Sequence, residues 1–77
     1  MQSKRDDYRA TIDDIDDEII ALVDYRIDMM QMIDLWNQQN HIPSDDPARC
    51  AEVKERYTDC LGSIGASLSN LLQSMDF

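Results

Sequence analysis

Residues 8–36 read YRATIDDIDDEIIALVDYRIDMMQMIDLW, and the spacing of the apolar side chains in this stretch decides the fold. Successive members of one series are separated alternately by four and three residues, which is the heptad seam of paired helices. No glycine or proline interrupts the chain from Ser3 to Gln39, so we expect one helix about 55 Å long. The seam consists of Tyr8, Ile12, Ile15, Ile19, Leu22, Arg26, Met29, Ile33 and Trp36.

An apolar seam of this length needs a partner. The chain has 77 residues, and domains this small commonly depend on disulfides, metals or oligomerisation. The simplest cover for the seam is the same helix from a second copy. We therefore expect one helical domain over residues 1–77 that forms a homodimer. A second stripe widens the apolar face: Ile20, Val23, Ile27 and Met30.

The remainder of the chain predicts a loop and one or two shorter helices. Residues 40–46 form the loop, and Asp46 and Pro47 begin a helix as its N-cap and first residue. Gly62 ends this helix as its C-cap, and residues 62–65 separate it from a short third helix. One continuous second helix, with two glycines inside it at about 1 kcal/mol each, remains an alternative. The third helix would carry Leu68, Leu71, Leu72 and Met75.

Charge and composition exclude several classes of function. The net charge is −9, from 16 acidic and 7 basic residues, so neither nucleic acid nor an anionic membrane would attract this chain. No apolar run approaches the length of a membrane span. His41 stands alone in the loop, and a metal site would need more ligands.

The two cysteines indicate a reducing compartment. Cys50 and Cys60 lie ten residues apart on one predicted helix, about 15 Å along its axis, which is too far for a disulfide. No signal peptide precedes them. We expect reduced, half-buried packing residues in a cytoplasmic protein.

The arginines are the candidate binding residues. Arg26 occupies the seam. Its guanidinium group could extend to solvent or pair with a nearby carboxylate. The alternative is that it binds an anionic ligand through two hydrogen bonds. Arg9 lies 17 residues earlier, about 25 Å away, so the two meet only across an antiparallel pair of helices that cross near residues 17 and 18. Arg49, in the first turn of the second helix, is either an ordinary surface residue or part of an anion site.

Two segments resemble the all-helical chorismate mutases. Residues 8–26 resemble that family's first helix. The helix of the family begins with leucine-arginine and continues with two isoleucine-aspartate pairs separated by one residue. A second arginine follows a stripe of aliphatic residues. Residues 42–49, IPSDDPAR, resemble the family's entry to its second helix. The resemblance covers residues 8–54, and the spacing from Arg9 through Arg26 to Arg49 matches without a gap.

The resemblance implies an all-α fold, an intertwined antiparallel homodimer and a function. These proteins convert chorismate, a dicarboxylate, into prephenate by a Claisen rearrangement, without a metal or other cofactor, through positioning and electrostatic stabilisation. By position, Arg9 of one subunit and Arg26 and Arg49 of the other would grip the carboxylates. Asp46 would contact the hydroxyl side of the substrate, and Gln73 matches a glutamine that faces the ether oxygen.

Departures from the family pattern weaken the catalytic half of the site. Asn37 stands where the family has the lysine that donates to the ether oxygen, and losing that charge could cost a factor of about 10² to 10³. Cys50 replaces a glutamate, and the third helix is shortened. These departures predict a chorismate mutase that is weak alone. The alternative is an impaired relative that binds a small dicarboxylate, or that regulates or partners another enzyme.

Two other functions share parts of the evidence. A plain acidic helical interaction module fits the charge, but it leaves the arginine spacing unexplained. An isochorismate-pyruvate lyase shares the fold, but it would keep the lysine that Asn37 replaces.

Overall fold

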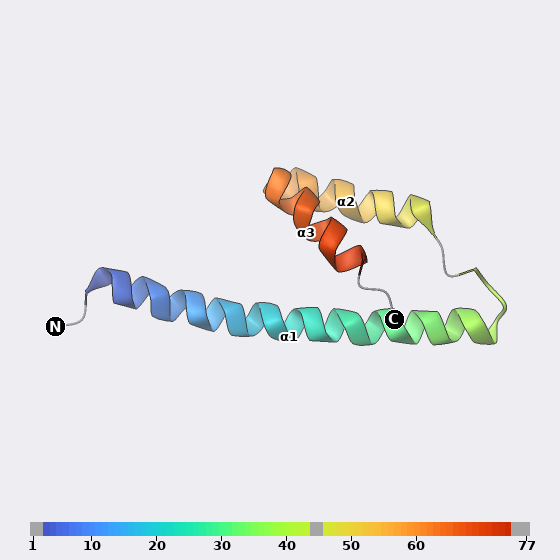
Figure 1. The fold of residues 1–77 in the computed structure, drawn as a ribbon, viewed down its shortest axis with the longest axis horizontal. Coiled ribbons are helices and arrows are strands. Elements are labelled where there is room, and N and C mark those ends of the chain that lie inside the picture. Colours follow the sequence, from blue (N-terminus) through green and yellow to red (C-terminus); the bar gives the residue numbers. More distant parts are fainter. Residues whose placement is uncertain (1–2, 44–45, 75–77) are drawn as a thin grey trace.

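The computed structural model describes residues 3–43 and 46–74, which form three helices and no strand (Figure 1). They are α1 (Lys4–Gln39), α2 (Pro47–Leu61) and α3 (Ser63–Gln73). The all-α prediction is confirmed, and so is the order of one long helix, a proline loop and shorter helices.

Local capping sets both ends of α1. The Ser3 hydroxyl accepts a hydrogen bond of 3.3 Å from the Asp6 backbone N–H, and Asp6 and Asp7 place negative charge in the first turn. At the other end the Asn40 side chain donates to the Trp36 carbonyl at 2.8 Å. His41 then adopts a φ of 54°, and this left-handed residue ends the helix after 36 residues.

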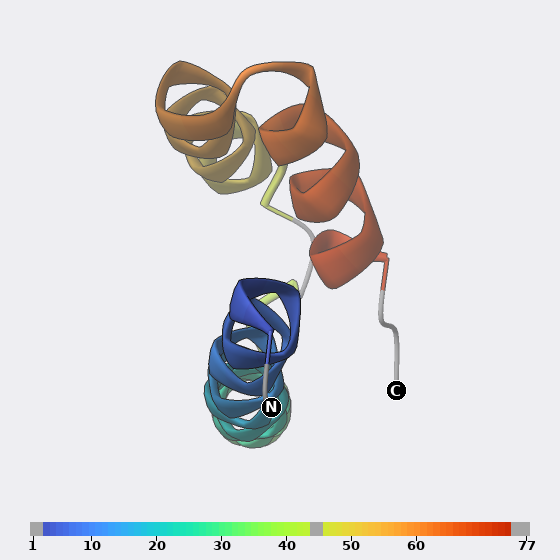
Figure 2. The same ribbon diagram turned by 90° about the vertical axis from the view of Figure 1, so that its left-hand side faces the viewer.

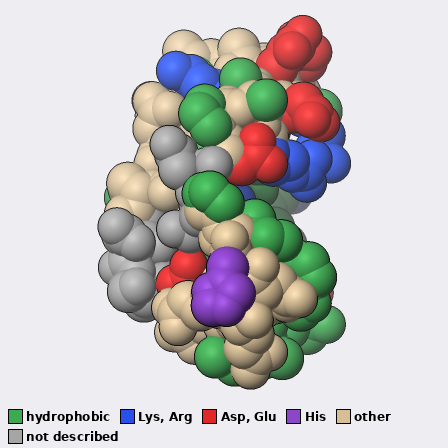
Figure 3. All heavy atoms as spheres, turned by 90° about the vertical axis from the view of Figure 1, so that its right-hand side faces the viewer, with side chains coloured by type: hydrophobic (Ala, Val, Ile, Leu, Met, Phe, Trp, Pro, Cys, Tyr) green, Lys and Arg blue, Asp and Glu red, His purple; other side chains and the backbone are tan. Residues whose placement is uncertain are grey.

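Most of the heptad seam of α1 stays uncovered by the other described residues. Its apolar members are between 42% and 68% exposed, and no residue of α1 is buried. The face that α1 turns toward α2 and α3 carries Val23, Ile27 and Met30, which are half-buried. It overlaps the seam at Ile19, Leu22 and Arg26, which line a hollow between α1 and the other two helices. Figure 2 shows α2 and α3 on one side of α1, and Figure 3, an end-on view, shows exposed hydrophobic side chains on the lower part of the molecule.

The molecule is therefore extended for its length. Its dimensions are 61 × 24 × 14 Å and its radius of gyration is 16.7 Å. A compact domain of this length would have a radius of gyration of about 11 Å. The excess comes from the unpaired N-terminal half of α1.

Gly62 separates α2 from α3 and decides between the two predicted arrangements. Its φ of 68° and ψ of −144° belong to a region that side-chain-bearing residues avoid. Its N–H donates to the Thr58 carbonyl at 2.7 Å, and its carbonyl accepts from the Ala66 N–H at 3.2 Å. Gly62 thus caps both helices, and the alternative of one continuous second helix is wrong. The predicted break over residues 62–65 is also too wide, because α3 begins at Ser63.

Gly65 lies inside α3, where α3 crosses α2 closely. A Cβ atom at this position would overlap the Tyr57 carbonyl and press against the Leu61 side chain. The crossing buries a small core that includes Val53 and Leu72, 8% and 5% exposed. Leu68 is half-buried and Leu71 is exposed, whereas Met75 lies outside the described residues.

The cysteines depart from their predicted burial. Cys50 and Cys60 are both free thiols, but both are exposed. They lie toward opposite ends of α2. No other described helix packs on the outer side of the layer that α2 and α3 form, so side chains on that side stay exposed.

Candidate anion-binding site

The C-terminal end of α3 links the other two helices and assembles the site. From α1, Arg26 Nη1 donates to the Leu72 carbonyl at 3.2 Å. From α3, Gln73 Nε2 donates to the Cys50 carbonyl in α2 at 3.2 Å. These two hydrogen bonds bring Arg26, Gln73 and the start of α2 into one region.

Arg26 turns inward instead of reaching for solvent. It is half-buried, although its seam neighbours Leu22 and Met29 are exposed, and its Nη1 also donates to Met30 Sδ at 3.0 Å. Among residues 3–43 and 46–74 it forms no ion pair with a carboxylate. No described carboxylate compensates its charge, and the side chain lines a hollow of about 170 Å³. The hollow is lined by Ile19, Leu22, Val23, Arg26, Tyr57, Leu68 and Leu72.

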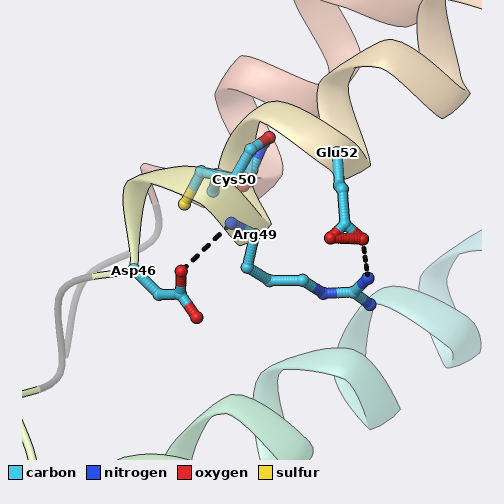
Figure 4. A network of polar contacts seen from close by, with 5 residues as sticks. Asp46, Arg49, Cys50 and Glu52 are labelled. Carbon is cyan, nitrogen blue, oxygen red and sulfur yellow. Dashed lines mark hydrogen bonds and ion pairs between the residues drawn. The ribbon is translucent and has the colours of Figure 1, made fainter.

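The first turn of α2 supplies a second cation. Asp46 Oδ1 accepts a hydrogen bond of 3.1 Å from the Arg49 backbone N–H, which confirms Asp46 as the N-cap. The Arg49 side chain is 60% exposed, pairs with Glu52 at 3.5 Å, and extends from α2 toward α1 (Figure 4). An exposed pair at this distance stabilises little, so Arg49 remains available to a ligand at the positive end of α2. Asp45, which precedes Asp46 in the sequence, lies outside the described residues.

Asn37 and Arg26 share one face of α1. They are 11 residues apart, which is three turns of helix, and both side chains are half-buried. The Asn37 carbonyl accepts from the Ile42 N–H at 2.9 Å and so ties the loop back to α1.

Gln73 is positioned by a residue that the sequence analysis did not single out. Its Nε2 donates to the Ser69 hydroxyl at 2.8 Å, and Ser69 is fully buried. Gln73 is itself half-buried, so it is not a solvated surface residue. The sequence does contain a pattern that indicates this contact: Ser69 lies one turn before Gln73 on the same helical face, next to Leu68 and Leu72.

Arg9 is the predicted site residue that the single chain does not bring to the others. It is exposed and lies in the N-terminal part of α1, which α2 and α3 do not reach. Hydrogen bonds place Arg26 and Gln73 at the end of α3 and join Gln73 to the start of α2, which carries Asp46 and Arg49. Asn37 lies three helical turns from Arg26 on α1, and Arg9 stands apart. Within the described residues, no three His, Cys, Asp or Glu side chains are placed to hold a metal ion. None of the described helices is long and apolar enough to cross a membrane.

Comparison with known families gives a match over most of the chain. The sequence profile described as chorismate mutase type II matches residues 8–70, which include every predicted site residue except Gln73. No curated protein and no solved structure matches the chain significantly.

Proposed function

Because the chain belongs to the chorismate mutase type II family, we propose that it is an isomerase that converts chorismate to prephenate and is slow on its own. The observation that carries the proposal is Arg26, a half-buried guanidinium without a described carboxylate partner beside an apolar hollow. The rearrangement breaks one C–O bond and forms one C–C bond within a single substrate. The site therefore has to hold and compact a dicarboxylate, which arginines and an apolar wall do well.

The roles follow from the position of each group. Arg26 and Arg49 hold the two carboxylates, with Arg49 assisted by the start of α2. Gln73, held by Ser69, donates an amide N–H toward the ether oxygen. Asn37, on the same face of α1 as Arg26, donates an uncharged amide N–H to the substrate. Asp46 accepts from the hydroxyl of the substrate with the carboxylate oxygen that the cap leaves unused.

A second copy would complete the site. The seam is symmetric about residue 17, so an antiparallel pair of α1 helices opposes Ile15 to Ile19, Ile12 to Leu22, and Tyr8 to Arg26. In that register Arg9 of the partner lies next to Arg26 and adds a third cation. The exposure of the seam supports this homodimer.

We also propose that residues 1–77 form one domain in a reducing, cytoplasmic setting. Its support is that both thiols are free and exposed, because exposed thiols persist best where disulfides are kept reduced.

Asn37 and Cys50 favour one alternative. An uncharged amide stands where developing negative charge would need a cation, and a thiol stands where the family pattern has a carboxylate. A chain with the arginines and without these groups would bind a small dicarboxylate, or partner another enzyme, without turning the ligand over.

A chorismate turnover assay on the full chain tests the proposal. We expect slow loss of chorismate with matching formation of prephenate, and Arg26→Ala should abolish it. Arg56→Ala removes the same charge from an exposed position on α2 and should leave the rate unchanged. Circular dichroism checks that Arg26→Ala still folds, and Arg26→Lys keeps the charge if it does not.

The outcomes separate the two functions. Equal rates for Arg26→Ala and the unmodified chain would overturn the proposed site. If turnover is absent but chorismate raises the melting temperature in an Arg26-dependent manner, the binding function replaces the enzymatic one.

A further inference from the structure

Asp34 differs from every other described carboxylate. All the other Asp and Glu side chains among residues 3–43 and 46–74 are exposed, whereas Asp34 is half-buried. Within those residues it forms no ion pair with a lysine, arginine or histidine. Partial burial of a carboxylate without a cation is unfavourable, so the position of Asp34 requires an explanation.

Asp34 lies on the face of α1 that the candidate site uses. The half-buried residues of α1 all fall on this face: Val23, Arg26, Ile27, Met30, Asp34 and Asn37. Asp34 is one turn beyond Met30, whose sulfur accepts from Arg26 Nη1, and three residues before Asn37. Asp34 and Asn37 are therefore neighbours on this face, since residues three apart on a helix lie side by side.

The second cation, Arg49, lies on the side of α2 that faces α1 (Figure 4). The loop after α1 returns the chain so that α2 begins above the C-terminal half of α1 (Figure 1). From there the Arg49 guanidinium extends toward α1 (Figure 4). A ligand held by Arg26 and Arg49 would face the half-buried surface of α1, which carries a carboxylate at position 34 and an uncharged amide at position 37.

We propose that Asp34 is a specificity-determining residue of this site. Its carboxylate repels ligand carboxylates from the Asn37 end and favours a ligand that presents a hydrogen-bond donor there, such as a hydroxyl or ammonium group. The same charge opposes the negative charge that develops on the ether oxygen during rearrangement, so Asp34 adds to the slowness expected from Asn37. This inference rests on the proposed function, because it assumes that Arg26 and Arg49 hold the ligand.

Chorismate binding to charge-neutral variants tests the inference. Asp34→Asn keeps the shape and removes the charge, and it should tighten binding of chorismate roughly tenfold by isothermal titration calorimetry, since like charges a few ångströms apart at a protein surface repel by about this amount. Asp28→Asn is the matched control, because it makes the same change at an exposed position of α1, and it should change the affinity less than about twofold.

A second ligand separates charge repulsion from a merely structural effect. Shikimate has ring hydroxyls but only one carboxylate, so Asp34→Asn should improve its binding less than that of chorismate. Asp34→Ala should act in the same direction as Asp34→Asn. Equal affinities for Asp34→Asn, Asp28→Asn and the unmodified chain would overturn the inference, and so would equal gains for the two ligands.

Failure of the inference and failure of the proposed function give different results. If Arg26→Ala abolishes chorismate binding while Asp34→Asn has no effect, only the role of Asp34 is wrong. If Arg26→Ala leaves binding unchanged in the Asp34→Asn background, the proposed site itself is wrong. If neither the unmodified chain nor Asp34→Asn binds chorismate, both are overturned.

Discussion

At the scale of single residues, the charge on one face of α1 sets the expected rate. Arg26 supplies a cation at one end of this face, and Asn37, three turns away, supplies only a neutral donor. A neutral amide holds an oxygen in place, but it stabilises developing negative charge less than an ammonium group does. Asp34, between the two, makes this end of the face more negative still.

Asn37→Lys should therefore raise kcat/KM for chorismate by about 10²-fold, because it restores a charged donor toward the ether oxygen. Initial rates of prephenate formation measure the effect. Gln31→Lys adds the same charge at an exposed position of α1 and should leave kcat/KM nearly unchanged. Equal gains from both lysines would mean that general electrostatic attraction of the substrate, and not the position of residue 37, controls the rate.

At the scale of the elements, the two glycines have separate functions. Gly62 has open space around the position of a Cβ but a φ of 68°, so its backbone conformation requires glycine. Gly65 has ordinary helical geometry but no space, because α2 lies against it. The first makes the turn between α2 and α3, and the second sets how closely they cross.

Gly65→Ala should lower the free energy of unfolding by about 1 to 3 kcal/mol, because the added methyl group forces α3 away from the Tyr57 carbonyl. Urea denaturation at one fixed protein concentration measures the change. Ser67→Ala, at an exposed position of the same helix, should change stability by less than about 0.5 kcal/mol. A Gly65→Ala protein as stable as the unmodified chain would contradict the close crossing.

At the scale of the whole molecule, a single chain leaves its largest apolar surface in water. The exposed seam along α1 and the radius of gyration of 16.7 Å have the same cause, since α2 and α3 lie over only one part of α1 and leave most of the seam exposed. Pairing two α1 helices would bury the seam, and burial of apolar area is the main driving force for association. The net charge of −9 on each copy opposes that association.

Ile15→Asp should dissociate the proposed dimer, because two new carboxylates would be buried near the centre of the seam. Sedimentation velocity should show a dimer for the unmodified chain and a dissociation constant about 100-fold higher or more for the variant. Ala21→Asp, on a different face of α1 and also exposed, should remain dimeric. A monomeric unmodified chain would remove Arg9 from the site.

Much of the fold could be predicted from residues close in sequence. Ser3 and Asp46 start their helices through hydrogen bonds to N–H groups three residues away, and Gly62 ends α2 through a bond to Thr58. Such contacts span one helical turn, so the local sequence determines them. The heptad spacing also identified the α1 face that one chain leaves uncovered.

The grouping of the site residues required the tertiary structure. Arg26 and Leu72 are 46 positions apart, Gln73 and Cys50 are 23 apart, and the sequence contains no local signal for either contact. The exposure of Cys50 and the burial of Ser69 and Asp34 depend equally on which helix lies over each residue. Caps and periodicity determined where the helices begin, end and present apolar surface. Only the crossing of α3 between α1 and α2 decided which polar groups meet, because that crossing depends on side-chain packing between segments far apart in the chain.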